Sequence, residues 1–386
     1  MLAGVLLFLP ASNQPMKDFI KPNRRAEYGL DLDKVFVGKE IVSRYDITVD
    51  ESVLSMWSGF MPTSSYPENS REFAGRLGFH QIFLPYGFLL NLTLSLGVES
   101  FSHSSILKLE LKEALYLTPA FPGDTFSSSV KIVDIRPSLR PGHSIIESSH
   151  LLFNQKGEPV FSLGRVSLFP PVKPRKTILS ETGGPFYNNR FKEHILSRTR
   201  SINMENVILK FNTGDLLLHP YVRPIGKSEN LFWATYLKNI HPSHYNYQRY
   251  QPGEILISGG IVLAMVTSIA GREFRQVLVQ QIDKAFHVHP VFAEDRVGAF
   301  SYVREVRQSM PGFEEISICT FGIRNMDTEH DLKDVAFPHS LFSTDIERPS
   351  EVRQIIEESC PVLQDNVCCV IYWTILRKVE EKGFER

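Results

Sequence analysis

Apolar and polar positions follow the same order of elements twice along this chain. In the first block, a nearly uninterrupted apolar stretch at 88–97 has helical length and predicts a helix buried on every side. Runs with strand character follow at 105–112, 125–136, 144–153 and 159–169, separated by turns that contain glycine. A helix followed by a series of antiparallel strands predicts an α+β fold.

The second block repeats the first about 171 residues later. The sequence PAFPGD at 119–124 recurs as PVFAED at 290–295, and a second buried helix is predicted at 261–271. Asp124 and Asp295 occur in both copies, so we interpret them as turn or capping residues. The chain is therefore predicted to contain the same domain twice.

The repeat divides the chain into four parts. We expect a leader at 1–30 without ordered structure, an N-terminal domain at 31–172, a linker at 173–208 and a C-terminal domain at 209–386. The apolar start of the leader lacks a basic segment and is too short to span a bilayer. Whether Met1 or Met16 begins the mature chain stays open.

Composition narrows the class of protein. The 386 residues are 42% hydrophobic and 22% charged with a net charge of −1, as in an ordinary soluble protein. This charge gives no reason to expect nucleic acid or a membrane as a partner. The four cysteines lack the spacing of a metal site, and Cys368-Cys369 is interpreted as a pair of buried thiols, which favours a cytoplasmic location. A homodimer is compatible with the sequence.

Candidate chemistry lies in the second copy. Asn239, His241 and His244 share a loop, and Gly259-Gly260 opens the second buried helix. A helix N-terminus offers free N–H groups to a developing enolate oxygen, as forms when water adds to an α,β-unsaturated thioester. An imidazole accepts the water proton near neutral pH, and a carboxamide holds the water.

Each of these residues also has a plainer explanation. Histidines and an asparagine beside a proline turn are mostly capping or surface groups, and a glycine pair often marks a close approach between two elements. A metal site would need His241, His244, His287 and His289 to converge, although no carboxylate or cysteine stands at a helpful spacing.

The order of these motifs over about residues 28–380 resembles the double-hotdog, MaoC-like enoyl-CoA hydratases, and within them the mesaconyl-CoA hydratase group. The resemblance rests on the two Pro-x-Phe-x-x-Asp anchors, Asn239-x4-His244, Gly259-Gly260 and the closing Tyr372-Trp373. It implies a tandem double hotdog, in which two antiparallel sheets each wrap a central helix and pair as a pseudo-dimer. It implies no cofactor and an acyl-CoA thioester as the substrate.

The resemblance also assigns roles to residues. His244 would be the acid/base, Asn239 its water-orienting partner, and Gly260 or Gly259 the oxyanion donor. In the first copy we match Phe60 and Ser65 with the catalytic pair, which indicates a degenerate site in the N-terminal domain.

Four further residues are expected to contact the substrate. His241 lies between Asn239 and His244, and Ile261 follows the glycine pair, where relatives tend to have histidine. Arg249 and Arg275, with Arg272 beside them, are candidates for the CoA phosphates or a substrate carboxylate, although arginines around a helix are more often solvated.

These expectations lead to a hydro-lyase that interconverts mesaconyl-CoA and β-methylmalyl-CoA. The alternatives are an (R)-specific hydratase for simple acyl-CoA or acyl-carrier-protein substrates, a catalytically silent acyl-CoA-binding protein and, less favoured, a thioesterase. A dicarboxylic substrate requires a cation in the acyl pocket, whereas a simple acyl chain does not.

Overall fold

The computed structural model describes residues 27–63, 65–172, 188–199, 209–275, 277–343 and 346–379. Most of the leader predicted at 1–30 and of the linker predicted at 173–208 lies outside these residues. Within the linker, residues 190–199 form a helix, α5 (Arg190–Thr199).

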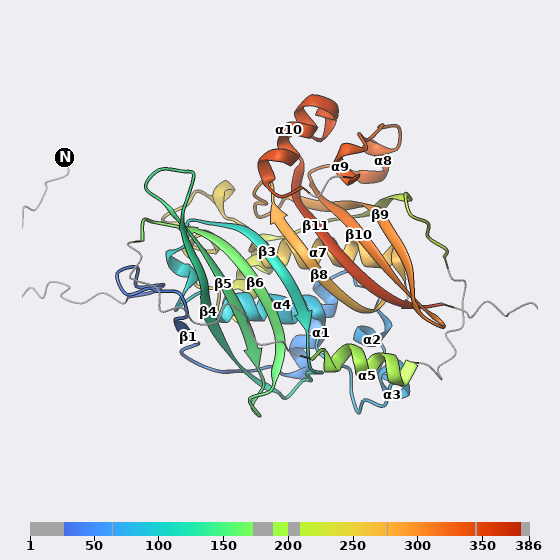
Figure 1. Cartoon of the computed structure of the whole chain (residues 1–386), viewed down its shortest axis with the longest axis horizontal. Helices are drawn as coiled ribbons and strands as arrows, with labels where there is room; N and C mark the ends of the chain where they lie inside the picture. Colours follow the sequence, from blue (N-terminus) through green and yellow to red (C-terminus); the bar gives the residue numbers. More distant parts are fainter. Residues whose placement is uncertain are drawn as a thin grey trace, which may run out of the picture.

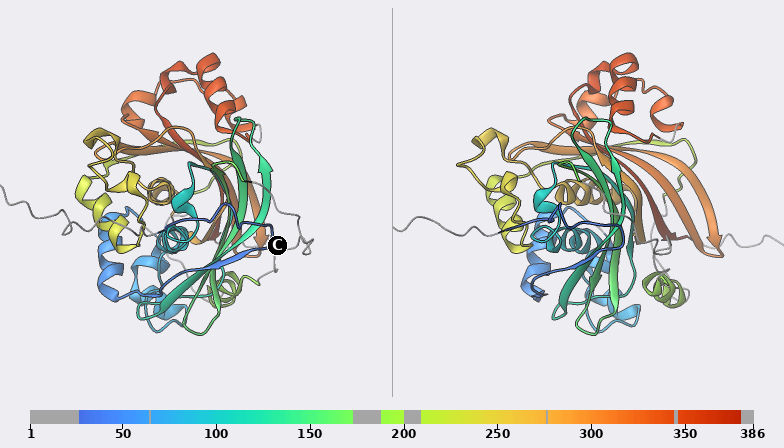
Figure 2. Two further views of the ribbon diagram at one scale, coloured as in Figure 1. Left: turned by 90° about the vertical axis from the view of Figure 1, so that its left-hand side faces the viewer. Right: turned by 60° about the vertical axis from the view of Figure 1, so that its left-hand side comes forward.

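The described strands form one antiparallel sheet in the order β1-β4-β5-β6-β3-β8-β11-β10-β9-β7, with β2 paired to β4. Their bounds are β1 (Glu40–Val42), β2 (Ile47–Thr48), β3 (Leu107–Tyr116), β4 (Thr125–Pro137), β5 (Ser144–Phe153), β6 (Pro159–Phe169), β7 (Leu216–Pro224), β8 (Val277–His287), β9 (Arg296–Met310), β10 (Phe313–Arg324) and β11 (Val367–Lys378). The strands of the two halves meet where β3 pairs with β8, with Lys112 opposite Lys284. The sheet curves around the helices on its inner side (Figures 1 and 2).

Two long helices, α4 (Tyr86–Leu96) and α7 (Gly259–Phe274), lie side by side within this curve. The remaining described helices are α1 (Glu51–Phe60), α2 (Tyr66–Asn69), α3 (Arg71–Arg76), α6 (Lys227–Tyr236), α8 (Thr328–Leu332), α9 (Ser340–Ser343) and α10 (Pro349–Ser359), with short 3-10 turns η1 (Ser102–Ser104), η2 (Pro242–His244), η3 (Pro252–Glu254) and η4 (Pro361–Leu363). None of the helices in the described ranges has the length and apolar character needed to cross a bilayer.

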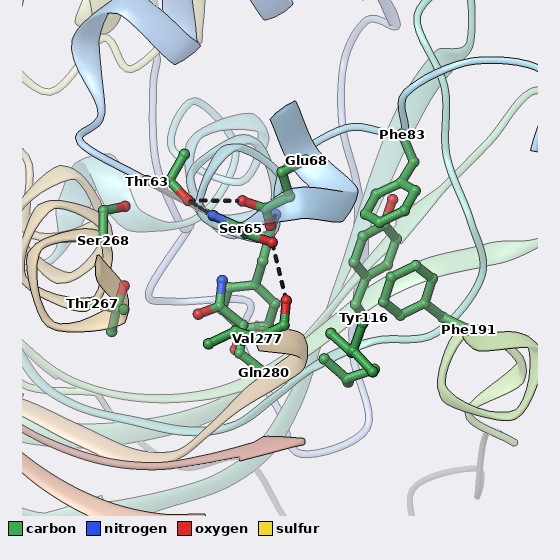
Figure 3. Close-up of a pocket in the computed structure, with 14 residues that line it drawn as sticks. Thr63, Ser65, Glu68, Phe83, Tyr116, Phe191, Thr267, Ser268, Val277 and Gln280 are labelled. Atoms are coloured by element: carbon green, nitrogen blue, oxygen red, sulfur yellow. Dashed lines mark hydrogen bonds between the residues drawn. The ribbon is translucent and has the colours of Figure 1, made fainter. Parts of the chain in front are cut away.

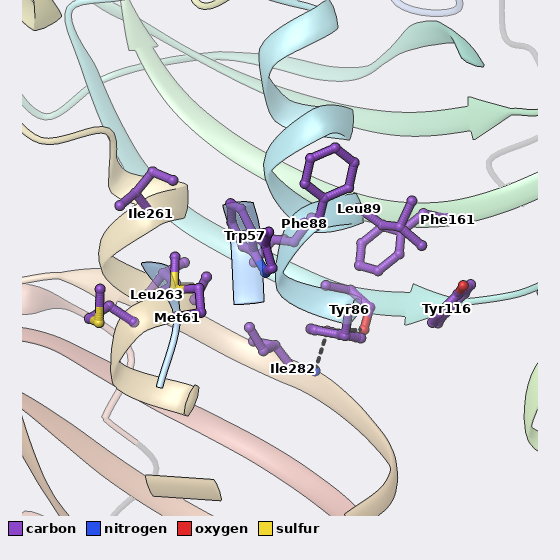
Figure 4. Close-up of a cluster of buried hydrophobic side chains, with 14 of the residues drawn as sticks. Trp57, Met61, Tyr86, Phe88, Leu89, Tyr116, Phe161, Ile261, Leu263 and Ile282 are labelled. Atoms are coloured by element: carbon purple, nitrogen blue, oxygen red, sulfur yellow. Dashed lines mark hydrogen bonds between the residues drawn. The ribbon is translucent and has the colours of Figure 1, made fainter. Parts of the chain in front are cut away.

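The main hydrophobic core lies between the sheet and the two central helices (Figure 4). Both predicted buried helices are confirmed, since nearly all side chains of α4 and most of those of α7 are buried. The helices approach closely at two glycines. A Cβ on Gly87 would lie 3.0 Å from the Ala264 Cβ, and one on Gly260 would lie 2.5 Å from Asn91 Oδ1. Glycine at these two positions therefore permits the crossing.

The repeated aspartates make the same contact in both halves. Asp124 Oδ2 accepts the Phe121 N–H at 2.8 Å, and Asp295 Oδ2 accepts the Phe292 N–H at 2.8 Å. Their interpretation as turn residues is confirmed. The α8–α10 segment has no counterpart in the first half and packs on the outer face of β9–β11 through a second apolar cluster.

Candidate active site

Asn239 follows α6 and is buried beside the start of α7. Its Nδ2 donates to the Ser258 Oγ at 3.3 Å, and Ser258 is the residue that precedes α7. Its Oδ1 accepts the His241 N–H at 3.4 Å. The carboxamide is therefore held against the N-terminus of the central helix.

His244 is buried at the end of η2. Its Nδ1 lies 2.8 Å from the Leu256 carbonyl oxygen, an acceptor, so Nδ1 carries the proton and Nε2 keeps its lone pair. Burial, aided by the positive charge of Lys108, lowers the pKa of His244 to about 3. The imidazole is therefore neutral at pH 7 and able to accept a proton.

The first residues of α7 are packed tightly. A Cβ on Gly259 would lie 2.6 Å from His287 Nε2, and Gly260 faces Asn91. The first N–H groups of a helix have no acceptor within the helix, so they point toward whatever lies before it. The glycine pair thus has a steric role, because a side chain at either position would meet His287 or Asn91.

A pocket opens beside this helix end, with about 320 Å³ of empty space that includes open solvent. It is lined by residues of both halves, namely Leu94, Lys108, Glu110, Leu111, Arg165, Gly259, Gly260, Leu263, Ala285 and His287. Asn239 and His244 lie outside this lining and connect to it through Ser258 and Leu256, which precede the glycine pair. The two domains together therefore form the candidate site.

The sequence-predicted substrate contacts are only partly brought together. His241 lies near His244, with 5.7 Å between ring centroids, and its Nδ1 lies 2.7 Å from the Ser243 Oγ. Ile261 is buried in the main core, away from the pocket lining. Arg249 is exposed on the loop after η2.

Arg275 does not reach this site. It follows the last residue of α7 and is exposed, so the helix separates it from Gly259 by about 24 Å at 1.5 Å per residue. Its neighbour Arg272 donates to the Pro62 carbonyl at 3.2 Å and lies over the Tyr221 ring. Arg272 and Arg275 therefore lie at the opposite end of α7 from the glycine pair, and their contact with the substrate stays a prediction.

The equivalent site in the first half differs from the sequence-based match. Helices α1 and α6 are offset by 176 residues at both ends, and α2 and η2 begin with the same offset. Thr63 and Glu68 therefore correspond to Asn239 and His244, and the match to Phe60 and Ser65 is wrong by three residues. The pattern Thr63-x4-Glu68 repeats the spacing of Asn239-x4-His244.

Glu68 occupies the N-terminus of α4 (Figure 3). Its Oε1 accepts the N–H of Tyr86, the first residue of α4, at 3.1 Å, and its Oε2 accepts the Thr63 hydroxyl at 3.3 Å. Burial raises the pKa of this carboxyl. A second pocket, about 480 Å³ and open to solvent, is lined here by Thr63, Ser65, Glu68, Phe83, Tyr86, Tyr116, Phe191, Thr267, Ser268, Gly271, Val277, Leu278, Val279 and Gln280.

Proteins of known structure share this arrangement of strands and helices. A MaoC-domain dehydratase from Chloroflexus aurantiacus superimposes with a TM-score of 0.69 at 16% identity, covering 90% of this chain and 96% of the other. A Mycobacterium tuberculosis protein with a double hotdog fold superimposes with a TM-score of 0.63 at 12% identity, covering 91% and 98%. The fold is a MaoC-like double hotdog.

The sequence comparison agrees with the expected resemblance. Mesaconyl-CoA hydratase from Cereibacter sphaeroides is 22% identical over 278 residues, which cover 69% of this chain and 81% of that protein. No family model matches the chain. The resemblance to MaoC-like proteins that the sequence predicts is confirmed.

Sequence reasoning did not identify Lys108 and Arg165, and it considered His287 only as a metal ligand. Arg165 follows Phe161 and Leu163 at alternate positions of β6, and both of those side chains are in the main core. A charged residue at an inward-facing position of a strand is unusual, and this feature of the sequence could have identified Arg165 as a candidate site residue. Within the described ranges, no three His, Cys, Asp or Glu side chains converge as a metal site would require.

Proposed function

We propose that this chain is an acyl-CoA hydratase/dehydratase that adds water reversibly across the C2–C3 double bond of an enoyl thioester. The observation that carries the proposal is the neutral, buried His244 with Nδ1 bonded to Leu256, beside Asn239 and the free end of α7. This arrangement supplies a base, a group that orients water and donors for an oxyanion.

In the hydration direction, His244 Nε2 would accept a proton from water while the hydroxyl bonds to C3. The π electrons of the double bond move to C2, and the charge spreads to the thioester oxygen as an enolate. The N–H groups of Gly259 and Gly260 would stabilise that oxygen. The imidazolium then returns its proton to C2, which completes the addition of one water.

Asn239 cannot take a proton, so its proposed role is to hold the attacking water. Its carboxamide is fixed by Ser258 and by the His241 N–H, and this limits its orientation. Residues of both halves line the pocket, which supports one site built by a single chain.

We propose mesaconyl-CoA as the substrate, converted to β-methylmalyl-CoA. Support comes from the similarity to a mesaconyl-CoA hydratase and from the basic side chains in the pocket. The substrate carries a carboxylate on C3, so it needs a positive group close to the reacting carbon.

The test follows the absorbance of the enoyl thioester after mixing purified protein with mesaconyl-CoA, with crotonyl-CoA as the uncharged comparison. We expect the band to fall with mesaconyl-CoA and to persist in a folded His244→Ala variant. A band that stays constant with both thioesters, while binding is measurable, would contradict the hydratase and favour a binding protein.

A further inference from the structure

Arg165 is a buried cation without a partner. Its side chain is 1% exposed, and none of its three guanidinium nitrogens has a hydrogen-bond partner among the residues that the structure describes. Leaving a charged group buried and unpaired is strongly unfavourable, so such a group normally has a counter-ion.

A second buried arginine, Arg377, shows which contacts a structural arginine makes in this fold. Arg377 is also 1% exposed, but it donates to the Phe274 and Leu209 carbonyls at 2.7 and 2.8 Å and lies 3.0 Å from Glu314. Both residues lie on sheet strands, yet only Arg377 has a carboxylate beside it. The difference points to a partner for Arg165 that comes from outside the described residues.

Arg165 lines the same pocket as Gly259 and Gly260, together with Lys108. Lys108 lies on the neighbouring strand β3, and its ammonium makes no hydrogen bond or ion pair within the described part of the chain. Glu110 is the acidic residue of the lining, and its carboxylate lies near Lys112 and Lys284, at 3.9 and 3.7 Å. The pocket therefore has a surplus of positive charge.

The positive charge of the pocket contributes to lowered pKa values of the neighbouring histidines. Burial, together with the charges of Lys108 and Arg165, lowers the pKa of His287 to about 4. The same two cations contribute to the lowered pKa of His241. An anion in the pocket would offset the positive charge of Arg165 and Lys108 that lowers these pKa values.

We propose that Arg165, assisted by Lys108, binds a carboxylate carried on the acyl group, so that the substrates are CoA thioesters of dicarboxylic enoyl acids. This inference rests on the proposed function. The CoA phosphates are a poor alternative because the pantetheine arm separates them from the thioester, whereas Arg165 and the glycine donors line one small pocket. A guanidinium also binds a carboxylate through two parallel hydrogen bonds.

Fumaryl-CoA and crotonyl-CoA provide a matched pair, because they differ by a carboxylate in place of a methyl group. We expect wild-type protein to favour fumaryl-CoA in kcat/KM, and the ratio to fall about 100-fold in Arg165→Met. Arg165→Lys should give an intermediate ratio. In Arg377→Met, the matched buried arginine, the ratio should be unchanged.

Thermal unfolding checks that the variants fold and adds an independent readout. Arg165→Met should raise the melting temperature by a few degrees, since it removes an unpaired buried charge, whereas Arg377→Met should lower it. A ratio that is unchanged in folded Arg165→Met and Arg165→Lys would overturn the inference.

Binding of succinyl-CoA and butyryl-CoA separates this inference from the proposed function. These saturated thioesters cannot be hydrated and differ in the same way as the first pair. Preference for succinyl-CoA that is lost in Arg165→Met would support the carboxylate site even if no enoyl thioester is turned over. Hydration of fumaryl-CoA and crotonyl-CoA with equal kcat/KM would support the proposed hydratase and contradict the carboxylate site.

Discussion

The two pseudo-equivalent sites of this chain share a scaffold and differ in what lies before the central helix. In the first half, the Glu68 carboxyl accepts the Tyr86 N–H at the start of α4. In the second half, His244 bonds instead to Leu256, and the pocket opens beside the Gly259-Gly260 end of α7. A carboxylate therefore bonds the first N–H of the central helix in the first half, at the helix end where we propose that the second half binds a thioester oxygen.

The charges of the two pockets also differ. Glu68 is the titratable acid of the first lining, which contains no lysine, arginine or histidine. The second lining contains Lys108, Arg165 and His287 beside the paired Glu110. The two halves therefore keep the same turns and helix crossing, while a few polar side chains give their pockets different charges.

The largest expected effect comes from replacing His244 by glutamine, with the same replacement of Glu68, its counterpart in the first half, as the comparison. His244→Gln removes the proposed base, so we expect kcat with mesaconyl-CoA to fall about 10²- to 10⁴-fold. Glu68 belongs to the site of the first half, away from the proposed base. Glu68→Gln keeps the size of this side chain and one acceptor oxygen, so kcat should change less than about twofold. Comparable losses in both folded variants would contradict a single active site.

The water-orienting groups offer a second paired test. Asn239→Ala should lower kcat about 100-fold, because misplaced water no longer meets C3 in the right geometry. Thr63→Ala, at the corresponding position of the first half, should retain wild-type kcat. Steady-state kinetics with both variants checks this, and equal effects would mean that the 176-residue correspondence has no functional meaning.

The pH dependence distinguishes a carboxylate substrate from a neutral one. Burial, with the Arg165 charge, lowers the pKa of Lys108 to about 7, so its ammonium loses a proton as the pH rises through 7. We expect kcat/KM for fumaryl-CoA to fall severalfold between pH 6 and 9 and that for crotonyl-CoA to change less. Lys108→Arg should flatten the profile, and a decline that persists in this variant would exclude Lys108 as its source.

The smallest effect concerns the two glycines at the helix crossing. Gly260→Ala would force Asn91 to move, and we expect it to lower the free energy of unfolding by about 1–3 kcal/mol. Gly87→Ala meets Ala264 at a longer 3.0 Å and gains helix propensity, so its cost should be below about 1 kcal/mol. Denaturant unfolding of both variants measures the difference, and a larger loss for Gly87→Ala would contradict it.

The repeated turns and buried helices were predictable because their residues recur at fixed spacing. Asn239 and His244 could be proposed from the Asn-x4-His motif before Gly259-Gly260, which the second copy has and the first lacks. Arg165 and Lys108 could not, because the pairing of β3 with β6 and the packing of α7 against α4 bring them to the glycine pair from more than 90 residues away. Glu68 could not be predicted because the short loops after α1 and α6 share few residues, so the match to Phe60 and Ser65 is shifted by three residues.

The number of acyl-thioester sites per chain tests the central claim most directly. Calorimetric titration with succinyl-CoA should give one equivalent per chain, with binding lost or weakened in Arg165→Met and unaffected by Thr63→Ala. Two equivalents, one of which persists in Arg165→Met and disappears in Thr63→Ala, would show that the first half binds thioester and would contradict the account.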